Sequence, residues 1–216
     1  MNAPVLPQKR LVIVGATGMV GGYALHYALD HPAIDGAIAI SRKATGLRHP
    51  KLKEVLHQAI FCLGVYTGAV PDAELRKITV DYAIEFARVL HASSPNATFA
   101  FLSGGGADPT GRSRMAFARY KGEAETALSA AGFPRVYIFR PAYIYPVQPR
   151  REPNFSYRLL RAIYPAFRVL LPNQVIRADD LARAMVDVAI GNTRERQSVV
   201  FENRDIRAMV KSAGSA

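Results

Sequence analysis

The sequence contains little that would cross-link the chain or anchor it in a membrane. Its one cysteine, Cys62, cannot form a disulfide within the chain, which fits a reducing compartment. No apolar run approaches the ~20 residues of a membrane-spanning helix, and residues 1–10 lack the apolar core of a signal peptide. The sequence therefore predicts a cytoplasmic protein without a transmembrane segment.

Acidic residues are also few: 17 Asp and Glu stand against 28 Lys and Arg, which gives a net charge of +11. A basic chain attracts polyanions such as nucleic acid, anionic lipid or a phosphorylated cofactor. The basic residues are spread along the chain, however, and no helix-turn-helix, zinc or RNA-binding signature is present. We interpret the charge mostly as a solvated surface that partly serves phosphate binding, and we expect no specific nucleic-acid partner. The five histidines have no metal-ligand spacing with Cys62, so no metal site is expected.

Apolar strands and helical patterns alternate along the 216 residues, a length sufficient for one domain with a sizeable core. Strands are predicted at 11–14, 37–40, 59–64, 98–102, 136–139 and near 198–201. Apolar residues recur at helical spacing over about 19–30, 72–91, 113–131 and 178–190. Asp72 is expected to cap the second of these helices. This alternation is typical of an α/β fold with a doubly wound parallel sheet.

Two segments depart from the regular alternation. Only residues 44–58 lie between Lys43 and the strand that begins at Ala59. Because a parallel crossover needs about a dozen residues or more, this link has room for one crossover but not for an additional strand and helix. From Pro149 onward, Pro, Arg and Tyr interleave with apolar residues. We interpret 149–216 as a small C-terminal subdomain on the substrate side of a single domain that spans 1–216.

The stretch LVIVGATGMVGG, residues 11–22, joins the first strand to the first helix through three regularly spaced glycines. Gly15 allows a tight turn with positive φ. Gly18 has no Cβ, so a pyrophosphate can approach the backbone, and Gly21 lets the helix pack close to the strand. The free N–H groups at the start of the helix then face the phosphates. The motif follows a strand and opens a helix, which is the context expected of an NAD(P)-binding Rossmann fold.

The second strand is followed by Ser41, Arg42 and Lys43. In a dinucleotide-binding fold this position meets the adenosine ribose, where an acidic residue favours NAD. No acidic residue stands here, and Arg42 and Lys43 offer donors that suit a 2′-phosphate. The sequence therefore predicts NADP (NADPH) in preference to NAD, although an ordinary basic loop is an alternative interpretation.

Several further stretches carry a resemblance to a known family. They are FCLGVYTG, VDYAIEFA, FLSGGGADP, YKGEAE, FRPAYIYP and FENRDIR, and with the glycine motif they span about 11–207. In these stretches the chain resembles an atypical short-chain dehydrogenase/reductase. Within that superfamily it is most similar to the Tat-interacting, oxidoreductase-like group and to bacterial relatives described as NAD-dependent epimerase/dehydratase-like.

The resemblance implies an active site with a serine after the fifth strand of the family sheet and a Tyr-x-x-x-Lys pair on the next helix. Ser103 matches the serine and Lys121 the lysine, but Phe117 stands at the position of the tyrosine. Phenylalanine has no hydroxyl to exchange a proton with a substrate. Tyr120 is an unsuitable substitute, since it points about 100° around the helix from Lys121. Tyr143 or Tyr145 is a candidate hydroxyl, against the alternative of a packed aromatic turn.

The resemblance also implies the residues that would hold the dinucleotide. Lys121 would bind the nicotinamide ribose, and Arg42 and Lys43 the 2′-phosphate. The remaining expected contacts lie in the glycine turn and after later strands: Gly15, Thr17, Gly18, Met19, Val20, Leu63, Gly64, Pro141 and Tyr143. Ser103 would orient a carbonyl, or else cap the glycine loop as a strand-end serine. For Lys121 the alternative is a solvated helix lysine.

Two functions are consistent with these residues. One is an NAD(P)-dependent oxidoreductase with an incomplete Tyr-x-x-x-Lys pair that acts on a small carbonyl or hydroxyl compound. The other is a non-catalytic NADP-binding regulatory or protein-interaction protein, and position 117 distinguishes the two. A protein partner or a homodimer is compatible with both, and a basic protein bound to anionic lipid or nucleic acid is a weaker third interpretation.

Overall fold

A computed structural model describes residues 9–40, 47, 49–51, 58–65, 68–147, 164–166, 169–191 and 197–213. Its centre is a sheet of six parallel strands in the order β2-β1-β3-β4-β5-β8. The strands are β1 (Lys9–Val14), β2 (Ile34–Ile40), β3 (Gln58–Phe61), β4 (Thr98–Leu102), β5 (Arg135–Arg140) and β8 (Gln197–Glu202). The predicted doubly wound parallel sheet is confirmed.

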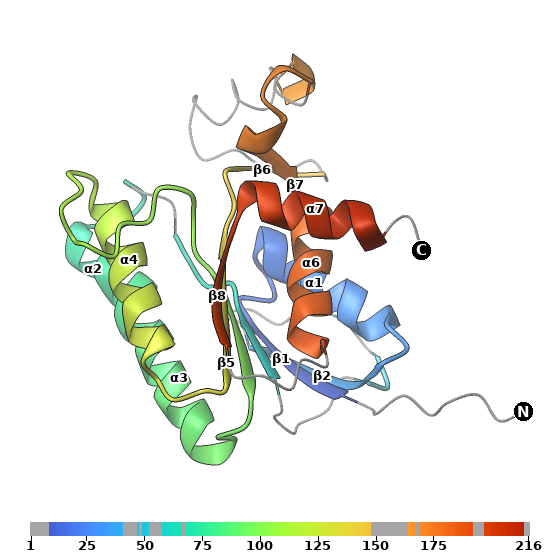
Figure 1. Cartoon of the computed structure of the whole chain (residues 1–216). Coiled ribbons are helices and arrows are strands. Elements are labelled where there is room, and N and C mark those ends of the chain that lie inside the picture. The colour runs from blue at the N-terminus through green and yellow to red at the C-terminus, as the bar shows by residue number, and fades with distance from the viewer. Residues whose placement is uncertain are drawn as a thin grey trace, which may run out of the picture.

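Helices cover both faces of this sheet (Figure 1). One layer consists of α1 (Met19–Asp30), α6 (Ala178–Ile190) and α7 (Asn203–Ala213), and the other of α3 (Tyr82–Ser93) and α4 (Ala116–Ser129). Side chains alternate between the two faces along each strand. Leu11 and Ile13 therefore enter the core under α1 and α6, while Val12 and Val14 enter the core under α3 and α4.

β2 is the end of the sheet within the described part of the chain, and β1 lies directly between β2 and β3. This order is the one expected if the short link after β2 carries a single crossover. The outer edge of β2 is not bare, because the backbone N–H of Ala37 donates to the carbonyl of Lys51 at 2.7 Å.

The predicted helix over 72–91 is instead three consecutive helical segments. They are α2 (Asp72–Arg76), a π-helical turn (Lys77–Asp81) and α3. Asp72 is not the cap that the sequence predicts. Pro71 occupies the N-cap position, and the Asp72 carboxylate accepts a hydrogen bond from the Tyr120 hydroxyl of α4 at 2.5 Å. The Asp72 side chain thus joins two neighbouring helices.

The helix predicted over 113–131 begins later, at Ala116, because the preceding residues form a loop. Asp108 holds this loop, since its carboxylate accepts the backbone N–H groups of Thr110 at 2.9 Å and Ser113 at 2.6 Å. The loop lies directly against α4 at Gly122. A Cβ on this glycine would lie 2.1 Å from the Asp108 carbonyl oxygen. Gly122 therefore sets how close the loop comes to the helix.

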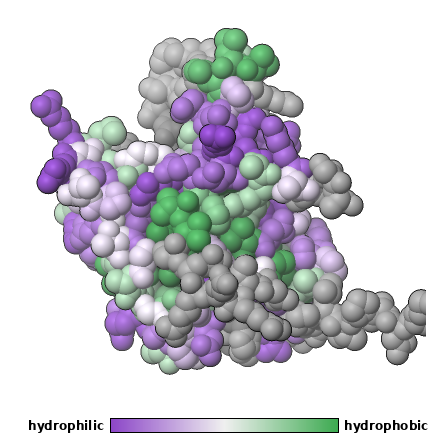
Figure 2. All heavy atoms as spheres, viewed as in Figure 1, coloured by the Kyte–Doolittle hydropathy of each residue, from purple (hydrophilic) through white to green (hydrophobic). Residues whose placement is uncertain are grey.

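Most of the described residues after 149 belong to the main layers. β8 pairs with β5, and α6 packs against α1. β6 (Tyr143–Tyr145) and β7 (Val175–Arg177) form a separate parallel pair beyond the carboxyl end of the sheet (Figure 1). Val169 and Leu170 are strongly exposed, with exposed fractions of 77% and 74%. Figure 2 shows an apolar tip beyond the carboxyl end of the sheet.

Candidate functional site

A cleft of about 470 Å³ opens at the carboxyl end of the central strands. Ligands of open α/β sheets bind in this position, outside the carboxyl ends of the strands. The walls come from the first turn of α1, the segment after β3, the glycine loop after β4, the first turns of α4 and the segment after β5. The lining residues are Gly18, Met19, Val20, Cys62, Leu63, Gly64, Val65, Leu102, Gly104, Gly105, Phe117, Lys121, Pro141, Ala142, Tyr143, Ile144 and Pro146.

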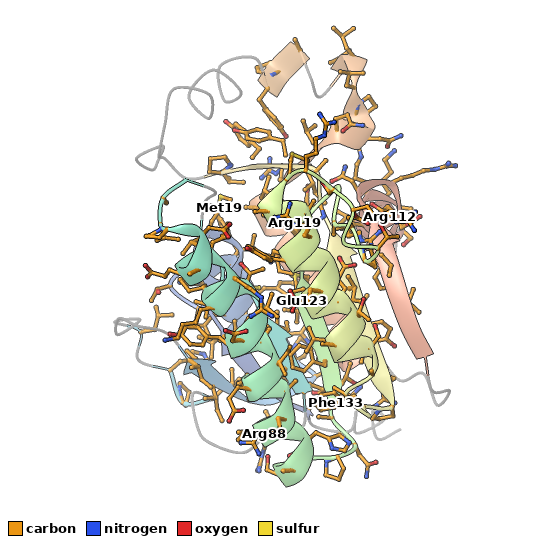
Figure 3. The ribbon with its side chains drawn as sticks, turned by 90° about the vertical axis from the view of Figure 1, so that its left-hand side faces the viewer. Met19, Arg88, Arg112, Arg119, Glu123 and Phe133 are labelled. Carbon is orange, nitrogen blue, oxygen red and sulfur yellow. The ribbon has the colours of Figure 1, made fainter. Side chains whose placement is uncertain are left out.

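The glycine turn has the backbone that its sequence predicts. Gly15 has a φ of 85°, which disfavours any residue with a Cβ. A Cβ on Gly21 would lie 2.2 Å from the Gly15 carbonyl oxygen, so only glycine lets α1 pack this closely on the turn. Figure 3 places Met19 at the same end of the molecule as Arg119, opposite Arg88 and Phe133.

The start of α1 fits a diphosphate. The first N–H groups of a helix have no intrahelical partner and attract anions. No acidic side chain stands in the first turn of α1, and no side chain caps it at Gly18. Across the cleft, a Cβ on Gly64 would meet nothing within 4 Å, so this stretch of backbone is open to a ligand.

Most of the residues predicted to hold a dinucleotide come together in this cleft. Those that line it are Gly18, Met19, Val20, Leu63, Gly64, Lys121, Pro141 and Tyr143. Gly15 and Thr17 belong to the same turn but do not line the cleft. Arg42 and Lys43 lie outside the described residues, so the predicted 2′-phosphate site stays a prediction.

The Lys121 side chain is buried at the floor of the cleft, and the residue is 6% exposed. Its ammonium donates to the Leu102 carbonyl at 2.8 Å and lies 4.8 Å from the centroid of the Phe101 ring. Burial lowers the pKa of Lys121 to about 8, against the opposing effects of Cys62 and Glu125. Lys121 is therefore not a solvated helix lysine.

Ser103 takes part in an ionic network that runs from the buried Glu125 through Arg140 to the exposed Glu202. Its hydroxyl donates to Glu125, which also accepts from Arg140 through two bonds, from Nε at 3.0 Å and from Nη2 at 2.5 Å. Arg140 in turn reaches Glu202 at 3.0 Å. Ser103 does not line the cleft in this arrangement. Its predicted role in orienting a carbonyl stays a prediction. The alternative of a cap on the glycine loop is not what this bond shows, because the hydroxyl donates to Glu125 of α4 instead.

Phe117 lies in the cleft wall, one helical turn before Lys121. A Cβ on Gly104 would lie 2.6 Å from Cζ of the Phe117 ring, so the ring rests on glycine backbone. Tyr120 faces away from the cleft and binds Asp72. Tyr145 stacks on Tyr164 with ring centroids 3.7 Å apart, and of the two candidate tyrosines only Tyr143 lines the cleft.

Sequence reasoning assigned no role to Asn203, which fastens one wall of the cleft. Its side-chain oxygen accepts from the backbone N–H of Ala142 at 3.0 Å. Its amide nitrogen donates to the carbonyls of Asn173 at 2.9 Å and Val175 at 3.2 Å. Asn203 therefore ties α7 to the segment after β5 and to β7. The FENRDIR resemblance was the signal that pointed to this position.

Comparisons with solved structures show proteins of the same architecture. A thiolation-reductase di-domain from an archaeal non-ribosomal peptide synthetase superposes with a TM-score of 0.69 at 15% identity, over 95% of this chain and 75% of that one. The Bordetella bronchiseptica enzyme WbmF, solved with NAD+, gives 0.66 at 12% identity, over 97% and 79%. The chain shares the α/β fold of these proteins, which agrees with the fold that its sequence resemblance implies. This level of identity shows the fold alone, and no family model matches the sequence.

Curated relatives bear on the predicted location. Protein fmp52, mitochondrial, of Emericella nidulans is 28% identical over 157 residues, and the protein of that name from Aspergillus clavatus is 29% identical. Each match covers 62% of this chain and 66% of the relative. The prediction of a cytoplasmic protein is contradicted by these names. Among the described residues, no helix combines the length and apolar character needed to cross a membrane.

Proposed function

We propose that this protein binds a nicotinamide dinucleotide and acts as an oxidoreductase on a small carbonyl or hydroxyl compound. The observation that carries the proposal is that the open first turn of α1 and the buried amine of Lys121 face one cleft. The NAD-bound state of WbmF, which has the same fold, supports the choice of ligand.

The residues that line the cleft would have different roles according to their positions. The N–H groups at the start of α1 would bind the diphosphate, and the backbone at Leu63 and Gly64 would pass along the ribose. Phe117 and the segment from Pro141 to Ile144 would enclose the reacting atoms and limit the access of water. When bound, a reduced nicotinamide supplies the hydride, while the protein supplies position and the proton.

A second candidate function is a non-catalytic NADP-binding regulatory or interaction protein. Phe117 is the observation that favours it, since the family tyrosine is replaced by a ring without a hydroxyl. Both functions require cofactor binding, and only the first requires turnover. Incubating the protein with NADPH and a panel of aldehydes, ketones and quinones, and following the NADPH absorbance, separates the two.

Phe117→Tyr is expected to raise reductase activity at least about tenfold, a modest part of the range for a positioned general acid. The substitution keeps the ring and adds a hydroxyl on the helix face shared with Lys121. Initial rates at saturating NADPH measure the effect. Tyr120→Phe is the matched control, because it removes a hydroxyl from the same helix outside the cleft. Fast turnover by the unmodified protein that Tyr143→Phe or Tyr145→Phe abolishes would place the proton donor elsewhere.

NADPH is expected to bind more tightly than NADH, and Arg42→Ala to remove part of the difference, about three- to tenfold. Arg42→Ala would remove one charge-assisted contact to the 2′-phosphate. Each such contact stabilises NADPH binding by about 1 kcal/mol or more. Calorimetry with both cofactors measures the preference. Arg88→Ala serves as the control, since Arg88 lies on α3 at the opposite end from Met19 (Figure 3). Equal affinities for the two cofactors would contradict the proposed 2′-phosphate site.

A further inference from the structure

We propose that the Lys121 ammonium itself donates the proton to the oxygen of an uncharged, apolar carbonyl substrate. This inference rests on the proposed function and assigns the proton donor of the same cleft. It differs from the role that the family resemblance implies, in which the lysine binds the ribose and tunes a tyrosine.

The other candidate donors near Lys121 are engaged elsewhere or have no proton to give. Phe117 lacks a hydroxyl, the Ser103 hydroxyl is bound to Glu125, and the Tyr120 hydroxyl is bound to Asp72. Among the described lining residues, the side chains that carry an acidic proton are Lys121, Tyr143 and Cys62. The Cys62 thiol is a weak donor, and burial raises its pKa to about 12. A tyrosine variant in the experiment distinguishes Lys121 from Tyr143.

The ammonium has bonding capacity left for a ligand. It carries three N–H donors, and one of them is bound to the Leu102 carbonyl. A buried donor without an acceptor costs about 1–3 kcal/mol or more when charged. Since Lys121 lines the cleft, its ammonium can donate to an oxygen atom of a ligand bound there.

Burial of the amine favours release of its proton near neutral pH, while Cys62 and Glu125 oppose that release. Cys62 faces it from the end of β3, Tyr143 lies in the segment after β5, and the Phe101 ring of β4 lies beside it. Glu125 follows one turn later on α4, but its carboxylate is bound by Arg140. Burial is the largest effect on the amine and brings its pKa to about 8. A general acid with a pKa close to the working pH is the most effective.

The step balances without a further reactant. As the carbonyl carbon receives hydride from the reduced nicotinamide, the π electron pair of the C=O bond moves to the oxygen. That oxygen takes a proton from Nζ of Lys121, which becomes a neutral amine still bound to the Leu102 carbonyl. Water then returns a proton to the amine. The product is an alcohol, and the dinucleotide is left oxidised.

The lining also restricts the substrate. Lys121 is the one charged side chain among the described lining residues, and most of the others are apolar or glycine. Away from the first turn of α1, which the diphosphate of the cofactor would occupy, a substrate carboxylate or phosphate would lose its hydration with one cation to compensate, which is unfavourable. An apolar aldehyde or quinone requires no such compensation and leaves the ammonium to its carbonyl oxygen.

The experiment combines variants with a measurement that does not depend on turnover. The pKa of Lys121 is obtained from the pH dependence of its acylation rate, followed by peptide mass spectrometry. NADPH affinity is measured by fluorescence, and reduction of apolar aldehydes and quinones is followed from pH 6 to 10. The variants are Lys121→Arg, which keeps the charge, Lys121→Met, which keeps the volume, and Tyr143→Phe. Lys77→Arg on the outer face is the control.

The unmodified protein is expected to show an acylation pKa near 8 and a rate that falls about tenfold per pH unit above that value. Lys121→Arg and Lys121→Met lose tenfold or more in rate, while NADPH affinity changes by less than threefold in at least one of them. Normal NADPH binding with no reduction by the unmodified protein overturns this inference together with the proposed oxidoreductase activity. Normal NADPH binding with full rates in both lysine variants overturns this inference alone. So does loss of activity in Tyr143→Phe only. Absence of NADPH binding overturns the proposed function as well.

Discussion

Replacing Glu125 by alanine is expected to lower the free energy of unfolding by about 3 kcal/mol, the low end of the range for breaking a buried ion pair. Glu125 is buried, and its carboxylate accepts from both Arg140 and Ser103. Its removal leaves the mostly buried Arg140 with Glu202 as its ionic partner and leaves the Ser103 hydroxyl without this acceptor. Urea unfolding followed by circular dichroism measures the change.

Glu123→Ala is the matched control for this prediction. Glu123 lies two residues earlier on α4 and also pairs with an arginine, Arg76, but both side chains are 43% exposed. Exposed pairs contribute about 0–1 kcal/mol, so this variant is expected to stay within 1 kcal/mol of the unmodified protein. A similar decrease in the free energy of unfolding in both variants would show that the network around Ser103 stabilises the fold no more than an exposed ion pair does.

Gly18→Val is expected to weaken NADPH binding by about 100-fold or more, which corresponds to about 2.7 kcal/mol. Gly18 lines the cleft at the N-cap of α1, where a branched side chain would occupy the position of the diphosphate. Its backbone is extended, with φ −77° and ψ 172°, a conformation that valine adopts readily. A Cβ on Gly18 would lie 3.0 Å from the Gly15 carbonyl oxygen, so the turn must shift by a few tenths of an ångström to accept it. The fold is expected to persist with this shift, and calorimetric titration measures the loss of binding.

The control for the glycine turn is Gly22→Ala in the same helix. A Cβ at Gly22 would come no closer than 3.4 Å to the Ala16 carbonyl oxygen, and Gly22 does not line the cleft. Alanine also favours a helix interior over glycine by about 1 kcal/mol. NADPH binding by Gly22→Ala is expected to be normal. Unchanged binding by Gly18→Val would refute the phosphate role of the turn.

The parts of the fold that follow from local patterns were predictable. The bounds of α1 and α6 agree with the sequence-based ranges, because apolar spacing and flanking residues mark their ends. β2 begins earlier than predicted, at Ile34, because Asp35 and Gly36 interrupt its apolar pattern without ending its pairing with β1. No prediction was made for α7, although Ile206, Met209 and Val210 have the spacing of a helical face.

The candidate site likewise has parts that could be predicted from the sequence and parts that could not. The glycine turn is contained in a few consecutive residues, so its positive φ and close helix packing were readable from the sequence. The partner of Ser103 was not readable, because Glu125 is 22 residues away and Arg140 a further 15. Asn203 bonds to Ala142 and Val175, which lie 61 and 28 residues before it in the sequence. Such pairings depend on tertiary packing, and one sequence carries no local signal for them.

The packing of α6 on α1 has a consequence for the order in which the protein can be made. Synthesis adds about 5–20 residues per second, starting at the N-terminus. The apolar side of α1, with Ala24, Leu25 and Ala28, shares a core with Leu181 and Met185, which leave the ribosome long after α1. Until α6 has been synthesised, this apolar side of α1 stays exposed in the nascent chain, where it can bind chaperones or aggregate. A chain released before Ala178 would keep this surface exposed, even though it already contains the complete glycine turn.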